Sequence, residues 1–295
     1  MTEAKPLIII TGKDGQLGRS LQNAAKQFHQ FDFLFTNKEM LDITNAENVR
    51  QIFKKFNPAC CINTAAYTAV DLAETTRVQA FLVNATAVSN LAKTCAELNC
   101  PFIHISTDYV FDGKKNARYT EIDSTNPVNY YGFTKKAGEE SALNECKKTI
   151  VIRASWLYSE YGKNFVKTML HLFKTKNEIS VVGDQFGAPT YAGAMAFSLL
   201  KICDHIILKK SFDDFGIYHY CDEGNISWYD FANEIKNQSG ATCLVHEITS
   251  DEYPTPAKRP KYSVMSTTKI REIFDIEIKN WKENLKVCLK NMKVE

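Results

Sequence analysis

The feature that most constrains this chain is a regular alternation, in its first half, of short apolar runs with longer amphipathic stretches. The apolar runs cover residues 6–11, 31–36, 59–63, 101–107 and 149–155, and residues 84–98 form one of the amphipathic stretches between them. A short run that is apolar on both faces is typical of a parallel strand covered by helices on both sides. Strands and helices alternating at this spacing predict an α/β fold with a doubly wound parallel sheet of the Rossmann type.

The second half of the chain is less regular. Its pattern predicts helices over residues 164–174, 192–207 and 227–238, the last opened by a serine N-cap, and strands near 178–185 and 217–222. Three prolines between residues 252 and 263 exclude a regular helix or a central strand there. We therefore expect one domain over residues 1–157 and a smaller C-terminal domain over 158–295, some segments of which return to the main sheet.

Charge and composition exclude several classes of protein. The net charge of +2 over 295 residues favours neither a nucleic acid nor an anionic membrane as a partner. The longest apolar run near the N-terminus, residues 7–10, is too short for a signal peptide or a membrane span. The nine cysteines are scattered, form no Cys-x-x-Cys unit and show no metal-ligand spacing. These features predict a cytoplasmic protein with reduced thiols and no metal.

The first motif is a glycine-rich turn between an apolar strand and a helix. Gly12, Gly15 and Gly18 are spaced three apart in "GKDGQLG". Glycines at such a turn let the backbone take a positive φ and let a diphosphate approach closely, and the following helix N-terminus presents free N–H groups to it. A glycine turn without a ligand is the plainer alternative, but its place at the start of a βαβ unit favours dinucleotide binding.

The end of the second strand bears on which dinucleotide is bound. An acidic residue about twenty positions after the glycine turn would hold the adenosine ribose and favour NAD. In this chain Asn37 and Lys38 stand there, and neither repels a 2′-phosphate. The sequence therefore favours NADPH, with NADH also accepted, unless Asn37 only caps a turn.

The stretch "NYYGFTKKAGEE" contains two tyrosines and two lysines, of which one pair has helical spacing. Tyr131 and Lys135 are four residues apart and share one helix face, whereas Tyr130 and Lys136 have no such partner. A lysine ammonium one turn from a tyrosine favours the phenolate and lowers its pKa, which suits the phenol to proton transfer. Tyrosine and lysine at this spacing are also common on exposed helices, so the pair alone is weak evidence.

A hydroxyl group upstream strengthens the interpretation. Thr107 ends a buried strand in "STDYVFDG", where the catalytic groups of open α/β sheets lie. Its hydroxyl could donate to the same carbonyl oxygen that Tyr131 protonates. Ser106 is the alternative, and strand alternation allows one of the two to face the cleft.

Together these residues resemble the extended short-chain dehydrogenase/reductase superfamily and, within it, the dTDP-4-dehydrorhamnose reductase family. The resemblance covers nearly the whole chain, because family-like motifs follow one another in the family's order. They are "TGKDGQLG", "LDIT", "NTAAYTAVDLAE", "STDYVFDG", "NPVNYYGFTKKAGE", "RASWLYS", "NFVKTML", "VVGDQFGAPT" and "YPTPAKRP".

The resemblance implies roles for individual residues. Thr107, Tyr131 and Lys135 would be the catalytic triad. The cofactor would contact, besides Tyr131, Lys135, Asn37 and Lys38, the residues Gly12, Gly15, Gln16, Leu17, Gly18, Asp42, Ile43, Ala65, Ala66 and Thr68. The substrate would contact Val110, Trp156, Asn164, Gln185 and Arg259, the last through a diphosphate.

The implied activity is NAD(P)H-dependent reduction of the C4 keto group of dTDP-4-dehydro-β-L-rhamnose to dTDP-L-rhamnose, a cell-surface polysaccharide precursor of the O-antigen type. Some members of this family are dimers bridged by magnesium through carboxylates. Here Lys290 and Asn291 stand where such an acid would lie and Glu295 comes too late, so we expect no metal and either a monomer or a homodimer.

Three alternatives remain open. One is a reductase of a related keto-sugar nucleotide, and another is a non-catalytic NADP-binding regulatory subunit of the methionine adenosyltransferase type. A sugar-nucleotide epimerase is the weakest of the three.

Overall fold

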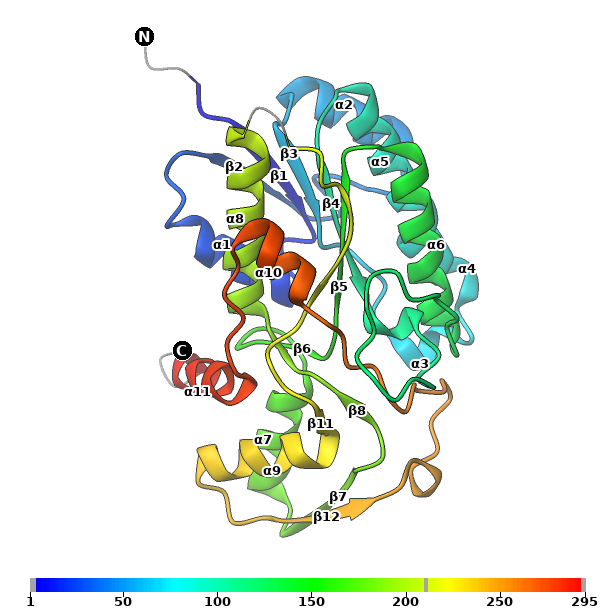
Figure 1. Cartoon of the computed structure of the whole chain (residues 1–295), viewed down its shortest axis with the longest axis vertical. Helices are drawn as coiled ribbons and strands as arrows, with labels where there is room; N and C mark the ends of the chain where they lie inside the picture. The colour runs from blue at the N-terminus through cyan, green and yellow to red at the C-terminus, as the bar shows by residue number, and fades with distance from the viewer. Residues whose placement is uncertain (1–3, 210–211, 293–295) are drawn as a thin grey trace.

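The computed structural model describes residues 4–209 and 212–292. Its centre is a six-stranded sheet in the order β10-β5-β4-β3-β1-β2, in which every neighbouring pair is parallel (Figure 1). The strands are β1 (Leu7–Thr11), β2 (Asp32–Thr36), β3 (Cys60–Asn63), β4 (Phe102–Thr107), β5 (Thr149–Ala154) and β10 (Gly216–Tyr220). The predicted doubly wound parallel sheet is confirmed.

Helices cover both faces of this sheet. One face packs on α1 (Gln16–Ala25), α8 (Ala192–Leu208) and α10 (Thr268–Phe274), and the other on α2 (Ala46–Phe56), α5 (Ala87–Glu97) and α6 (Tyr130–Glu145) (Figure 1). Each face has its own apolar core. Ile8 and Ile10 point to the α1/α8 side and Ile9 to the α2/α5 side, as the alternation of side chains along a strand requires.

β2 is less enclosed than the other four strands predicted in the first half of the chain. This strand lies at the edge of the sheet and pairs only with β1 among the described residues. Its residues Phe33, Leu34 and Phe35 are therefore half-buried rather than enclosed. The opposite edge is β10, which comes from the second half of the chain and pairs with β5.

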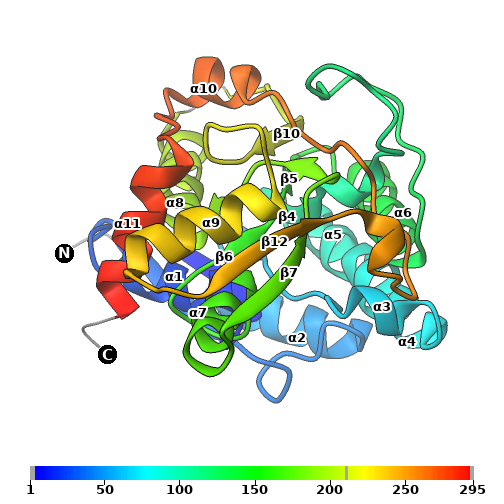
Figure 2. The ribbon, with the colours of Figure 1, turned by 90° about the horizontal axis from the view of Figure 1, so that it is seen from below.

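A smaller lobe lies beyond the carboxyl ends of the sheet strands (Figures 1 and 2). Its helices α7 (Phe165–Thr175), α9 (Trp228–Ser239) and α11 (Trp281–Met292) share a core that includes Phe231 and Leu285. Its two-stranded ladders pair β12 (Leu244–Ile248) with β7 (Glu178–Val182), β6 (Leu157–Tyr158) with β9 (Thr190–Tyr191), and β11 (Ile226–Ser227) with β8 (Phe186–Gly187). Ser227 caps α9 in a capping box, as the N-cap signal predicted.

The short helices α3 (Val70–Ala73) and α4 (Arg77–Phe81) and a π-helical turn, η1 (Leu82–Thr86), lead into α5, and two 3₁₀ turns, η2 (Asp108–Val110) and η3 (Ser250–Glu252), lie in loops. The nine cysteines are all buried and free. No helix within residues 4–209 and 212–292 is both long and apolar enough to cross a membrane.

The strand order fixes where a ligand can enter. The chain leaves β1 toward β2 on one side, and β3 lies on the other side, so the order of the strands reverses between β1 and β3. Ligands of open α/β sheets bind in the crevice that such a reversal opens at the carboxyl ends of the strands.

Candidate active site

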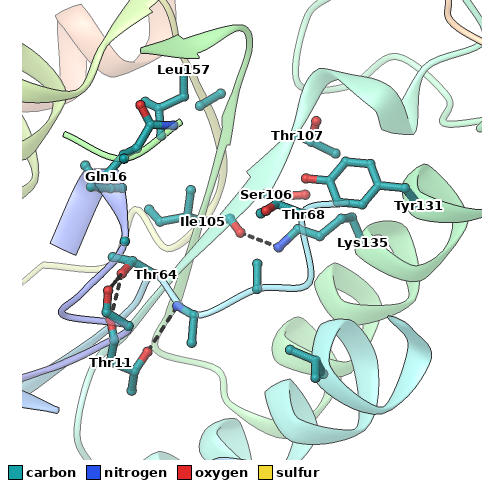
Figure 3. Close-up of a pocket in the computed structure, with 18 of the residues that line it drawn as sticks. Thr11, Gln16, Thr64, Thr68, Ile105, Ser106, Thr107, Tyr131, Lys135 and Leu157 are labelled. Carbon is teal, nitrogen blue, oxygen red and sulfur yellow. Dashed lines mark hydrogen bonds between the residues drawn. The ribbon is translucent and has the colours of Figure 1, made fainter. Parts of the chain in front are cut away.

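A cavity of about 1060 Å³ occupies this crevice and extends toward the smaller lobe (Figure 3). We call its two walls the sheet side and the lobe side. The sheet side is formed by residues that end or directly follow the strands, including Gly12, Thr64, Ala65, Ala66 and Thr107. The lobe side is formed by Trp156, Lys163, Phe165 and Trp228.

The glycine turn shapes the start of the sheet side. Gly12 has φ +71°, and a Cβ there would come within 2.8 Å of the Ala65 backbone nitrogen. A Cβ on Gly18 would overlap the Gly12 carbonyl oxygen, so this glycine lets α1 pack closely on the turn. Gly15 is the N-cap of α1 and supplies no capping side chain, and the first turn holds no acidic residue. The free N–H groups and the positive end of the helix dipole therefore suit a diphosphate.

The loop after β3 is tied to this turn. The Thr64 hydroxyl donates to the Thr11 carbonyl oxygen over 2.6 Å, and the Ala65 N–H donates to the Thr11 hydroxyl over 3.3 Å (Figure 3). Ala65, Ala66 and Thr68 line the cavity, as do Gln16 and Leu17. The small side chains of Ala65 and Ala66 leave room for the middle of an extended dinucleotide.

The far end of the sheet side holds the residues expected to contact the adenosine half. Asn37, Lys38, Asp42 and Ile43 all line the cavity. Asn37 also accepts the Met40 N–H over 3.2 Å, so it caps its turn as well as lining the cavity. Asp42 accepts from the Thr44 N–H and hydroxyl, over 3.0 and 2.6 Å, which fixes the loop after β2.

Tyr131 and Lys135 lie one turn apart on α6, and both line the cavity. Asn129 caps the helix by accepting the Gly132 N–H over 2.8 Å. Tyr130 instead packs under the Arg77 guanidinium, whose central carbon lies 4.8 Å from the ring centroid, and Lys136 faces Glu140 at 3.7 Å. The structure thus brings into the cavity the pair that spacing selected, and directs the neighbouring pair elsewhere.

The hydrogen bonds of Thr107 and Ser106 show which of the two hydroxyls is free to act beside Tyr131. The Ser106 hydroxyl donates to Glu139 Oε1 over 2.5 Å, and Glu139 is held in a buried ion pair by Arg153 at 2.7 Å. Thr107 lies beside Tyr131 in the cavity, and its hydroxyl lowers the pKa of the phenol (Figure 3). This arrangement favours Thr107 as the hydroxyl partner of Tyr131.

The electrostatics of Tyr131 differ from the expectation. Burial raises the pKa of Tyr131 above its ordinary value, the charge of Asp108 raises it further, and the Thr107 hydroxyl opposes both. The expectation that the Lys135 ammonium lowers this pKa is not met. Lys135 directs its Nζ to the Ile105 carbonyl oxygen at 2.6 Å, and burial lowers the pKa of Lys135 to about 8 (Figure 3). Burial removes water from both Tyr131 and Lys135. This loss of hydration changes both pKa values more than the closeness of the two groups does.

Asp108 and Trp228 are among the cavity residues that were not identified from the sequence. Asp108 is 2% exposed, accepts from the Thr107 hydroxyl over 3.1 Å, and has a pKa raised by burial to about 6. Trp228 stacks on Trp156 with ring centroids 3.5 Å apart. Asp108 lies within the "STDYVFDG" motif next to Thr107, so the sequence could have indicated it as a site residue. Trp228 could not be found in this way, because its partner Trp156 is distant in the chain.

The expected substrate residues are placed unequally. Trp156 lines the lobe side, with φ +48° at the end of β5. Val110 is fully buried in a core with Phe111 and Met265. Its side chain therefore packs inside the protein and does not face the cavity.

The other three expected substrate residues make contacts within the protein. Asn164 caps α7 and donates to Gln16 Oε1 over 2.9 Å. Gln185 donates to the Ser250 hydroxyl over 2.9 Å. Arg259 holds both oxygens of Asp71 at 2.9 Å, so its fork is occupied by a carboxylate.

A tyrosine and a lysine one helical turn apart, beside a threonine hydroxyl and a glycine turn at the switch point of a parallel sheet, define a short-chain dehydrogenase/reductase of the extended type. The description "RmlD substrate binding domain" belongs to a family model that matches residues 6–294. A dTDP-4-dehydrorhamnose reductase of Aggregatibacter actinomycetemcomitans is 42% identical over 285 residues, which is 95% of this chain and 97% of that protein.

Solved structures agree. The dTDP-4-dehydrorhamnose reductase of Bacillus anthracis, in complex with NADP, has a TM-score of 0.92 and 36% identity over 98% of this chain and 100% of that one. The enzyme of Clostridium acetobutylicum has a TM-score of 0.91 and 39% identity over 97% and 99%. The chain belongs to the dTDP-4-dehydrorhamnose reductase family.

Proposed function

We propose that this protein catalyses the NADPH-dependent reduction of the C4 keto group of dTDP-4-dehydro-β-L-rhamnose, giving dTDP-L-rhamnose for cell-surface polysaccharide synthesis. The observation that carries the proposal is the continuity of one cavity from the glycine turn, past Thr107, Tyr131 and Lys135, to the stacked pair of Trp156 and Trp228. Family membership supports the choice of substrate.

The dinucleotide would lie along the sheet side. Gly12, Gly15 and the N-terminus of α1 would hold its diphosphate, and Ala65, Ala66 and Thr68 would flank its central part. Asn37 and Lys38 would face the adenosine ribose, where the absence of an acidic side chain accommodates a 2′-phosphate and leaves NADH acceptable. When bound, the reduced nicotinamide supplies the hydride.

The chain's own residues would handle the proton. Tyr131 would donate its hydroxyl proton to the substrate carbonyl oxygen as negative charge develops on that oxygen. Thr107 would turn its hydroxyl from Asp108 to the same oxygen and donate a second hydrogen bond to it. Because burial holds the phenol in its neutral form, Tyr131 enters the reaction already protonated.

The lobe side would hold the sugar nucleotide. The two indoles offer a flat, half-buried apolar surface on which a 6-deoxy sugar or a base can pack. Lys163 is exposed at the cavity and could pair with a diphosphate. Arg259 remains a predicted diphosphate ligand, for which it would have to exchange Asp71 for the phosphate oxygens. Asn164 and Gln185 remain predicted contacts, and Val110 remains one through its main chain, because its side chain is buried in a core.

We further propose that residues 1–157 form the dinucleotide-binding domain and that residues 158–295 form mainly the substrate-binding domain. The return of β10 to the sheet supports the expectation that some later segments serve the first domain. A cytoplasmic location and a monomeric or homodimeric state are parts of the same proposal. No group of three or more His, Cys, Asp or Glu side chains lies where it could hold a metal in residues 4–209 and 212–292, and Glu295 falls outside them.

The test is a spectrophotometric NADPH-oxidation assay with dTDP-4-dehydro-β-L-rhamnose generated by the preceding epimerase, followed by NMR of the product. Oxidation that yields the L-rhamno configuration at C4 supports the proposal. The opposite C4 configuration indicates a reductase of a related keto sugar. No oxidation with any keto-sugar nucleotide, together with a stable protein partner, indicates the regulatory subunit instead.

A further inference from the structure

A chain of buried hydrogen-bonding side chains runs from the end of β1 to Lys135. Thr11, Asn63 and His104 are each at most 1% exposed, and they end three neighbouring strands or lie within them. The Thr11 hydroxyl lies 2.5 Å from Asn63 Oδ1, Asn63 Nδ2 lies 3.1 Å from His104 Nδ1, and His104 Nε2 lies 3.4 Å from Lys135 Nζ.

The donors in this series of hydrogen bonds fix the orientation of the Asn63 amide. Asn63 Oδ1 faces the Ala65 backbone nitrogen at 3.2 Å, and a backbone N–H can only donate. The oxygen must therefore lie on that side, which leaves Nδ2 facing His104. An amide NH₂ also only donates, so His104 Nδ1 must accept.

The imidazole then has its proton on the other nitrogen. Burial, followed by the positive charge of Lys135, lowers the pKa of His104 well below its ordinary value, so the ring is neutral. A neutral ring with an accepting Nδ1 carries its proton on Nε2. That N–H points at the nitrogen of Lys135, and an ammonium group has no lone pair to accept it.

We propose that His104 is a positioning residue whose Nε2–H disfavours the ammonium form of Lys135 and stabilises its neutral amine. The catalytic consequence rests on the reductase function proposed above. After Tyr131 has given its proton to the substrate, the Lys135 ammonium returns one proton to the phenolate. The amine that remains accepts the His104 N–H and later regains a proton from water.

The other charged groups around Lys135 do not replace this effect. Glu139 lies one turn further along α6 and favours the ammonium, so it raises the pKa of Lys135. Its charge is already shared with Arg153 from β5 through bonds of 2.9 and 2.7 Å. The Ile105 carbonyl oxygen accepts a hydrogen bond from Lys135 Nζ over 2.6 Å, which holds the side chain in place. His104, which lies on the facing strand β4, is thus the neighbour that disfavours the positive charge on Lys135.

The first test uses the unmodified protein. Long-range ¹H–¹⁵N correlation spectra of histidine-labelled protein identify which nitrogen of each imidazole carries the proton. We expect His104 to be neutral with its proton on Nε2. A proton on Nδ1 at this residue overturns the proposal, and no variant has to fold for this result.

The second test is the titration of Lys135, followed through its Cε resonance and assigned by its absence in Lys135→Met. In His104→Phe the midpoint should rise by about one pH unit or more, because the opposing N–H is gone. An unchanged midpoint overturns the proposal. The matched control is His219→Phe, which removes another buried imidazole from the same sheet, beside Arg153. An equal shift in this control would also overturn it.

The alkaline limb of the pH dependence of kcat should move upward in His104→Phe by the same amount as the titration midpoint. A role confined to packing would lower kcat at every pH and leave the limb in place. Because the NMR titration needs neither substrate nor cofactor, a failure of the proposed reductase function leaves the first two tests intact.

Discussion

The two sides of the cavity are built in different ways. The sheet side consists of loops that directly follow β1, β3 and β4, so its glycines, small residues and Thr107 are positioned by the hydrogen bonds of one parallel sheet. On the lobe side, Trp156 and Trp228 come from segments 72 residues apart and meet through a ring stack at 3.5 Å. From this comparison we expect the sheet side to bind the dinucleotide, which is common to the superfamily, and the lobe side to bind what is particular to one substrate.

Tyr131 lines the cavity and is the proposed proton donor, so its loss should stop the chemistry without weakening either binding step. We expect Tyr131→Phe to lower kcat by about 10²–10⁴-fold, the usual contribution of a general acid. The dissociation constant for NADPH, measured by fluorescence titration, should stay near the unmodified value. Near-normal turnover would remove Tyr131 from its assigned role, and Tyr130→Phe serves as the control on the adjacent residue.

Gly12→Ala should break the sheet side. An added Cβ would stand 2.8 Å from the Ala65 nitrogen at φ +71°, so the turn would have to move. We expect affinity for NADPH to fall by about 10-fold or more, equivalent to 1.4 kcal/mol or more, with the affinity for the sugar nucleotide less affected. Gly240→Ala is the matched control, since Gly240 has φ +72° and open space around it. Equal losses of NADPH affinity in both variants would contradict the role of the close approach.

Trp228→Ala should break the lobe side alone. Removing the ring leaves Trp156 without its stacking partner and widens the cavity. We expect KM for the sugar nucleotide to rise by about 10-fold, in line with an aromatic contact worth about 0.5–1.5 kcal/mol plus lost burial, at an unchanged dissociation constant for NADPH. Trp228→Phe should recover most of the loss. A change confined to NADPH binding would show that the two sides are not separate.

Lys135→Met gives the smallest effect, and it concerns stability. The pKa of Lys135 is about 8 in the folded protein against an ordinary value of 10.5. Below pH 8 both states hold the proton and the folded state bears the full cost of burying it. Between pH 8 and 10.5 the unfolded state holds more protons, so stability rises with pH. The methionine variant should thus gain about 1–2 kcal/mol at pH 7, after the lost bond to Ile105 is subtracted.

This gain should fall as the pH rises from 8 to 10.5 and vanish above about pH 10.5, where Lys135 has lost its charge in both states of the unmodified protein. Chemical denaturation at several pH values measures it. Lys136→Met is the matched control, because Lys136 lies at a partly exposed site, where it contacts Glu140 and the Thr125 carbonyl oxygen, and should show no such pH-dependent difference. A Lys135→Met protein that is less stable at pH 7 and stays so would contradict the inferred cost of burial.

The sequence by itself determined the features that depend on local periodicity. Apolar runs identified the five main-sheet strands of the first half, because a strand covered by helices is apolar on both faces, and also a strand near residues 217–222, which is β10. Glycine spacing identified the turn after β1, and a separation of four selected Tyr131 with Lys135, because a helix repeats every 3.6 residues. Each of these signals lies within a few positions of the chain.

The tertiary structure decided what depends on solvent exclusion and on partners distant in the chain. Spacing predicts that Lys135 lowers the pKa of Tyr131, but burial raises that pKa and lowers the pKa of Lys135 instead. No pattern in the sequence gives the degree of burial. The sequence also did not predict the Trp156–Trp228 stack or the Arg259–Asp71 pair. Only the folded chain determines which side chains from distant segments come into contact.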